Sequence, residues 1–179
     1  MRASRRGLSD PVGLLSGSLA LLVIVVSFGS ARADAGGLAL EVRLADSGRT
    51  IAELVAVVEA AAAAADVVRP YDELTVVLTD RIPGVDVDPL VGGLSVGDTV
   101  WVRTEGVAMP SRTLLHEVAH AFTPGAGHGE PFRRIYLAAV HEVYGSEVAS
   151  RELRRLAWVY DRCYLDRSCP RSERALPDP

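Results

Sequence analysis

The sequence predicts an α+β fold in which a small β-sheet packs on one helix and further helices follow toward the C-terminus. Three segments have the alternating or β-branched pattern of strands, at about residues 38–44, 74–79 and 99–103. Four other segments repeat apolar residues at helical spacing. One of these helices also carries two histidines four residues apart, so the fold class and a candidate site are predicted together.

Composition supports a folded domain with an acidic surface. The chain has 179 residues, of which 49% are hydrophobic, and this is enough apolar material to bury a core and excludes a disordered tail. All 19 basic residues are Arg, and four of them lie in the first 33 residues beside a single acid. The remainder therefore has 15 Arg and 22 acidic residues. We expect no nucleic-acid partner for so acidic a domain.

Residues 1–33 resemble an export signal. Arg2, Arg5 and Arg6 precede an apolar stretch at 12–28, and small residues at Ala31 and Ala33 suit a signal peptidase. Cleavage after Ala33 would leave a single domain at residues 34–179, secreted or held in the cell envelope. The alternative is an uncleaved membrane anchor, and residues 4–8 also resemble a twin-arginine signal.

The first half of this domain alternates strand and helix. A half-buried strand is predicted at 38–44, followed by a helix at 51–66 that begins with the capping box of Thr50 and Glu53. A second strand at 74–79 leads into a long loop at 82–98, where Gly92 and Gly93 indicate turns rather than a phosphate-binding loop. The third strand is predicted at 99–103.

A metal-binding motif lies on the next helix, which begins near Pro110. Its sequence is His116-Glu117-Val118-Ala119-His120. Residues four apart on a helix project from the same side, so two imidazoles can reach one Zn²⁺ while Glu117 approaches a water molecule beside the metal. The alternative is that both histidines are ordinary helix residues.

A catalytic zinc site needs a third protein ligand, and His128 is the candidate. Pro124, Gly125 and Gly127 end the helix and predict a tight reversal, after which Pro131 begins another helix. His128 lies in that reversal and can return toward the first two imidazoles. His128 could instead cap the following helix, and Glu142 on that helix is the competing ligand, whereas Glu130 is expected to cap it.

The motif followed by His128-Gly129-Glu130-Pro131-Phe132 resembles the HExxH…HGxxF/W pattern of SprT-like and related small zincin metallopeptidases. The resemblance is close over residues 112–136. It implies a zincin-like domain in which His116, His120 and His128 bind Zn²⁺ and Glu117 is the catalytic base. It also implies that the strand at 99–103 is the exposed edge of the sheet beside the metal, with Trp101 either at a substrate pocket or in the core.

Together these features predict an exported zinc-dependent metallopeptidase that acts on peptide or protein substrates. The alternative is a non-catalytic exported module that binds zinc or a partner. The membrane would be a partner only if the signal stayed uncleaved.

The C-terminal part adds smaller expectations. His141 is expected to be exposed rather than an oxyanion donor, and neither Tyr136 nor Tyr144 is singled out for that role. A last helix is predicted from Ser146, as N-cap, with its Arg and Glu residues on a solvated face. Cys163 and Cys169 are expected to form a disulfide, with free thiols or metal ligation as alternatives.

Overall fold

The computed structural model describes residues 22–27, 42–85 and 91–161 and confirms the α+β class. The described residues form a four-stranded mixed sheet and four α-helices, the last of which continues into a turn of π-helix. In chain order the elements are β1 (Leu22–Ser27), α1 (Ile51–Ala64), β2 (Glu73–Thr79), β3 (Gly93–Val96), β4 (Thr99–Arg103), α2 (Pro110–Phe122), α3 (Glu130–Tyr144), α4 (Ser146–Leu156) and η1 (Ala157–Asp161).

The strands are ordered β1-β2-β4-β3 in the sheet. The central pair β2 and β4 is parallel, with Val76 opposite Val100, and both outer pairs are antiparallel. The predicted strands at 74–79 and 99–103 are thus confirmed. The expectation that 99–103 forms the exposed edge is wrong, because β4 lies between β2 and β3.

The edge beside α2 is formed by β3, which sequence reasoning had assigned to a loop. Its residues Gly93–Val96 pair with β4 through a hairpin that turns at Gly97, whose φ is +60°. Gly93 begins this four-residue strand and Gly97 follows it, which gave the segment the composition of a loop. The pairing with β4 outweighs that local preference.

The predicted strand at 38–44 is not a strand of the sheet where the structure describes it. Residues 42–44 make one isolated bridge, between Arg43 and Thr50, and then a tight turn in which the Gly48 amide donates to the Leu44 carbonyl at 2.8 Å. Val42 and Leu44 pack against the core from this segment. The alternation of apolar and polar residues at 42–44 therefore reflects packing next to a turn and not a strand of the sheet. The remaining strand is β1, which falls inside the predicted export signal and pairs with β2.

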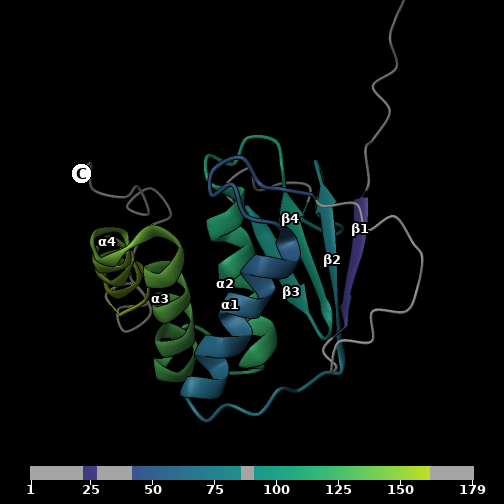
Figure 1. Ribbon diagram of the computed structural model, residues 1–179. Coiled ribbons are helices and arrows are strands. Elements are labelled where there is room, and N and C mark those ends of the chain that lie inside the picture. The colour runs from purple at the N-terminus through teal and green to yellow at the C-terminus, as the bar shows by residue number, and fades with distance from the viewer. Residues whose placement is uncertain (1–21, 28–41, 86–90, 162–179) are drawn as a thin grey trace, which may run out of the picture.

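Helices cover one face of the sheet (Figure 1). Helix α2 lies on β3 and β4, α1 lies beside α2, and α3 packs on both, with α4 beside α3. The capping box that begins α1 is confirmed: the Glu53 amide donates to Oγ1 of Thr50 at 3.1 Å and the Thr50 amide donates to Oε2 of Glu53 at 2.6 Å. Fully burying each large apolar side chain between these layers contributes roughly 1.5–3 kcal/mol. The core includes Leu54, Val58, Leu114, Leu115, Val118, Phe132 and Ile135.

Two predicted caps differ in the structure. Gly145 is the N-cap of α4 and Ser146 its first residue, because a φ of +85° at this sharp turn suits glycine. Gly129 is the N-cap of α3, and Glu130 lies in the first turn, where its negative charge favours the helix dipole.

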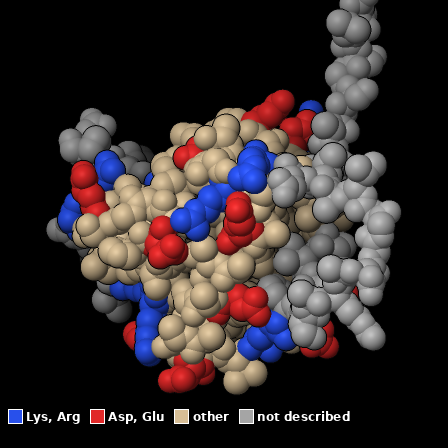
Figure 2. Space-filling view, in the orientation of Figure 1, with Lys and Arg blue, Asp and Glu red and all other residues tan. Residues whose placement is uncertain are grey.

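Acidic and Arg side chains are interspersed on the face shown in Figure 2, without a large region of one sign. Within the described ranges, no helix has both the length and the apolar character needed to cross a membrane.

Candidate metal centre

Helix α2 is held in place at its N-terminus by an acid from the turn before α1. Its N-cap, Met109, makes no side-chain capping bond, and Asp46, 65 positions before Ser111, takes that role. The Ser111 amide donates to the Asp46 carboxylate at 3.2 Å and the Ser111 hydroxyl donates to Oδ1 at 2.6 Å. The Tyr144 hydroxyl on α3 donates to Oδ2 of Asp46 at 2.8 Å. The helix that carries the motif is therefore fixed to two other parts of the fold.

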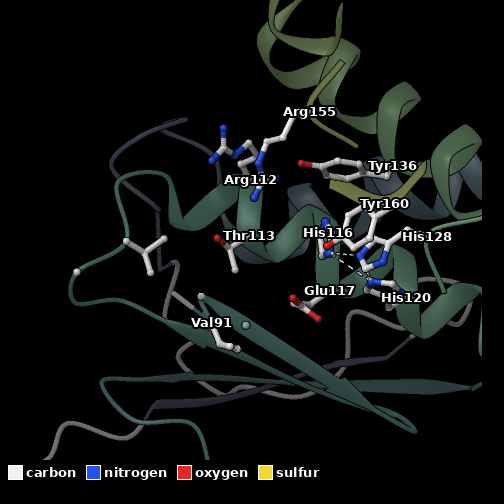
Figure 3. Close-up of a pocket in the computed structure, with 14 residues that line it drawn as sticks. Val91, Arg112, Thr113, His116, Glu117, His120, His128, Tyr136, Arg155 and Tyr160 are labelled. Carbon is white, nitrogen blue, oxygen red and sulfur yellow. Dashed lines mark hydrogen bonds between the residues drawn. The ribbon is translucent and has the colours of Figure 1, made fainter. Parts of the chain in front are cut away.

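The three predicted histidines meet at one point (Figure 3). The Nε2 atom of His120 lies 3.2 Å from that of His116 and 3.1 Å from that of His128, and the third side of this triangle is also 3.1 Å. All three side chains are partly buried. The structure thus confirms that these residues form a group able to hold a metal ion.

The donor set fits a cation. Three ring nitrogens converge at nearly equal distances, whereas three neutral imidazoles facing one another cannot all donate and accept with good alignment. Burial lowers the pKa of His120 and of His128 to about 4, and burial lowers the pKa of His116 as well. The rings are therefore neutral near pH 7, and the neutral imidazole is the form that binds a metal.

The turn after α2 brings His128 back to the helix. The Thr123 hydroxyl donates to the Ala119 carbonyl at 2.7 Å and ends the helix, and Gly125 and Gly127 adopt φ values of +77° and +54°. Arg133 Nε then donates to the His128 carbonyl at 2.7 Å. These bonds hold the tight reversal that the sequence predicted.

Aromatic rings fix the orientation of the imidazoles. Phe132 stacks on His120 with ring centroids 4.2 Å apart, and Tyr160 stacks on His128 at 3.6 Å with an interplanar angle of 13°. Tyr136 meets His116 edge to face at 5.1 Å. Rings held by packing lose less freedom when they bind a metal, so this layer favours metal binding.

Glu117 lies next to the triangle but outside it. The residue is only 8% exposed, and burial raises the pKa of its carboxyl to about 8. Its side chain packs on the backbone of β3 at Gly93, where a Cβ atom would lie 2.5 Å from the Glu117 Cγ. Gly93 therefore allows this close approach, a role that its interpretation as a turn residue missed.

A cavity of about 480 Å³ opens on the histidines and Glu117. Residues 91–93, at the start of β3, line one side, and Arg112, Arg155 and Tyr160 line the other (Figure 3). A second cavity of about 610 Å³ lies along β3 and also reaches Glu117 and His120. Among the described strands β3 is an edge of the sheet, and both cavities border it.

The alternative candidates lie elsewhere. Glu142 is exposed and its Oε1 lies 3.8 Å from Nη2 of Arg49, so the histidine triangle favours His128 as third ligand. His141 is exposed, as predicted. The Tyr136 and Tyr144 hydroxyls donate to Glu152 and Asp46, and Cys163 and Cys169 lie outside the described residues.

Sequence reasoning missed the charged wall of the cavity. Glu152 was expected on a solvated face, but it is 3% exposed and accepts from Tyr136, Arg112 and Arg155. A signal was available: Val148, Glu152 and Leu156 are four residues apart and share one face of α4. An acidic residue on the same helix face as two apolar residues is expected to be buried and to pair with a basic side chain.

Fold and site thus define an α+β protein with a candidate three-histidine metal centre. Comparison of the chain with protein-family models, with curated proteins and with solved structures found no match.

Proposed function

We propose that the protein is an exported zinc-dependent peptide hydrolase with a zincin-like site. The observation that carries this proposal is the pairing of the histidine triangle with a buried glutamate one residue after the first histidine. Three protein ligands are the usual set of a catalytic zinc, whereas a structural zinc usually takes four Cys or His ligands. Within the described residues the cluster contains His116, His120 and His128 alone.

His116, His120 and His128 would hold the ion through their Nε2 atoms. Imidazole nitrogens suit Zn²⁺ better than they suit Mg²⁺ or Ca²⁺, which prefer oxygen ligands. When bound, zinc supplies Lewis acidity, which lowers the pKa of water and polarises a carbonyl group.

Glu117 moves the protons. Burial raises the pKa of Glu117 to about 8, and a cation held by the three histidines would favour its carboxylate form. That carboxylate, only 8% exposed and poorly solvated, would readily accept a proton from an attacking water molecule. The protonated Glu117 then passes that proton to the leaving nitrogen of the cleaved peptide. Its contact with Gly93 restricts the positions that its carboxylate can take.

An extended substrate fits along β3. This strand is the sheet edge beside the site, and Gly93 and Leu94 line the cavities on its two sides. Backbone hydrogen bonds to a strand edge do not depend on side-chain identity. We therefore assign substrate binding to β3, whereas the sequence suggested the strand at 99–103, which is β4.

The direct test is cleavage of an unstructured protein such as casein by the purified protein. We expect cleavage with zinc, loss of cleavage on chelation, and recovery when zinc is restored. Glu117→Gln should retain zinc and lose cleavage. Equal cleavage by both forms would overturn the role of Glu117, and full zinc without cleavage by the unaltered protein would favour a non-catalytic zinc-binding module.

A further inference from the structure

Two arginines share one buried carboxylate in the cavity wall that faces β3. Nη1 of Arg112 donates to Oε1 of Glu152 at 2.8 Å, and Nη1 of Arg155 donates to Oε2 at 3.2 Å. The Tyr136 hydroxyl donates to the same Oε2 at 3.1 Å. Both oxygens of Glu152 are engaged, so this carboxylate is a fixed anchor for the two guanidinium groups.

The anchor leaves positive charge and donors unused. Two Arg charges face one Glu charge, and each guanidinium has five N–H donors, of which the bond to Glu152 uses only part. The side chains of Arg112 and Arg155 are 31% and 37% exposed, against 4% for Glu152. Nε of Arg155 has no acceptor among the residues that the structure describes.

Arg112 of α2 and Arg155 of α4 both belong to the cavity, in contrast to another arginine of α4. Arg112 and Arg155 line the space that His116 and Glu117 also line, and Figure 3 shows both guanidinium groups near the hydroxyl end of Tyr136. Arg151, also on α4, is exposed and does not line this cavity. The wall therefore places unused cationic donors beside the residues proposed to hydrolyse a peptide.

We propose that Arg112 and Arg155 form a subsite that binds a carboxylate group of the peptide substrate. This inference rests on the proposed hydrolase function and names its substrate class, which is peptides with an acidic group close to the cleaved bond. A planar guanidinium matches the two oxygens of a carboxylate and forms charge-assisted hydrogen bonds with them. The carboxylate can be the C-terminus of the peptide or the side chain of Asp or Glu.

Binding to the full-length protein stripped of metal tests the subsite, because no cation is then present to attract the carboxylate. The probes are acetyl-trialanine with a free C-terminal carboxylate, its amide, and the amide of acetyl-Ala-Glu-Ala, measured by isothermal titration calorimetry. At least one carboxylate probe should bind about tenfold or more tightly than the trialanine amide, as expected for one charge-assisted hydrogen bond. Preference for the first probe identifies a C-terminal carboxylate, and preference for the third identifies an acidic side chain.

Two variants should lose this preference and one should keep it. Arg155→Met and Arg112→Met each remove one guanidinium group and leave Glu152 with its other partners, while Arg151→Met removes an exposed Arg of α4 as a matched control. Circular dichroism would verify that each variant is folded. Equal binding of the three probes by the unaltered protein, or a preference that survives in both cavity variants, would overturn the subsite.

Turnover by the zinc-loaded protein separates this inference from the proposed function. Paired peptides that differ only in the carboxylate should differ in kcat/KM, and Arg155→Met should reduce that difference while zinc content stays unchanged. Cleavage without any preference for the carboxylate would overturn the subsite and leave the hydrolase. A binding preference without cleavage of any peptide would support the subsite and overturn the hydrolase.

Discussion

Gly93 on β3 and Glu117 on α2 are in such close contact that a methyl group on Gly93 would lie 2.5 Å from Cγ and 2.9 Å from Oε1 of Glu117. Non-bonded carbon atoms pack at about 3.5–4.0 Å, so even the smallest side chain requires the glutamate or the strand to move. A backbone position on the sheet therefore helps to determine where the proposed base lies.

Gly93→Ala should lower peptide hydrolysis by at least about tenfold, because small displacements of a catalytic group are costly. Zinc content should remain, since the atoms nearest to a Cβ at Gly93 belong to Glu117 and Thr113 rather than to the three histidines. Gly92→Ala is the matched control: its Cβ would lie 3.3 Å from Oγ1 of Thr113, a contact that a small shift can relieve. Similar activity in the two variants would contradict this role of Gly93.

His128→Ala should reduce zinc content as strongly as His116→Ala does, because each removes one of three nitrogens that lie 3.1–3.2 Å apart. Glu142→Ala should retain zinc, since Glu142 is exposed and close to Arg49. Metal analysis of the purified variants decides the assignment. Full zinc in His128→Ala together with loss in Glu142→Ala would transfer the third ligand to the glutamate.

Asp46→Ala should lower the free energy of unfolding by about 1–3 kcal/mol, because it removes the acceptor of the Ser111 amide and hydroxyl and of the Tyr144 hydroxyl. Urea denaturation measures the difference. Asp72→Ala, at an exposed position, should change stability by less than about 0.5 kcal/mol. Equal stability of the two variants would show that Asp46 does not anchor α2.

The capping box of α1 should make stability depend on pH in the acidic range. In the folded protein the pKa of Glu53 is lowered, mainly by the hydrogen bond from the Thr50 amide and secondly by the hydrogen bond with the Thr50 side chain. This stabilisation is present above the pKa of Glu53 in the unfolded chain and is lost as the pH falls through the lower pKa of the folded state. Glu53→Gln should therefore be less stable than the unaltered protein near pH 7, and the difference should shrink in acid. A difference that is constant with pH would contradict this linkage.

Export predicts a mature N-terminus at Asp34 and a disulfide between Cys163 and Cys169. Intact mass of the exported protein, with and without reductant, checks both expectations. Retention of residues 1–33 would favour an anchored form, in which Leu22–Ser27 can stay paired with β2 as in the structure. A mass that reduction leaves unchanged would argue against the disulfide.

Local sequence patterns predicted the helices and strands in which the apolar positions of the pattern are the buried positions of the structure. Ile51, Leu54, Val55 and Val58 repeat at helical spacing and are buried on α1. In β2, Val76, Val77 and Thr79 are both β-branched and buried. The histidine triangle was predictable because its spacing follows from one helix and one short turn. These features depend on contacts between residues that are close in sequence.

The features that were missed depend on contacts that local composition does not reveal. Strand β3 forms because Gly93–Val96 pairs with β4, although its glycines suggest a loop. Glu152 is buried because Arg112, 40 positions earlier, supplies the opposite charge. The glycines concealed β3, although β4 follows it directly in the sequence. The 40 positions between Arg112 and Glu152 concealed the charged cavity wall, which emerged only from the three-dimensional structure.

The order in which a ribosome makes this chain separates the metal centre from the cavity wall. His116, His120 and His128 are synthesised before α4 and η1, which provide Arg155 and Tyr160. A chain arrested before α4 would contain the three histidines and Glu117 but would lack Arg155, Glu152 and the ring that stacks on His128. The proposed carboxylate subsite is thus completed after the metal centre, and a nascent chain lacks it until α4 and η1 have been made.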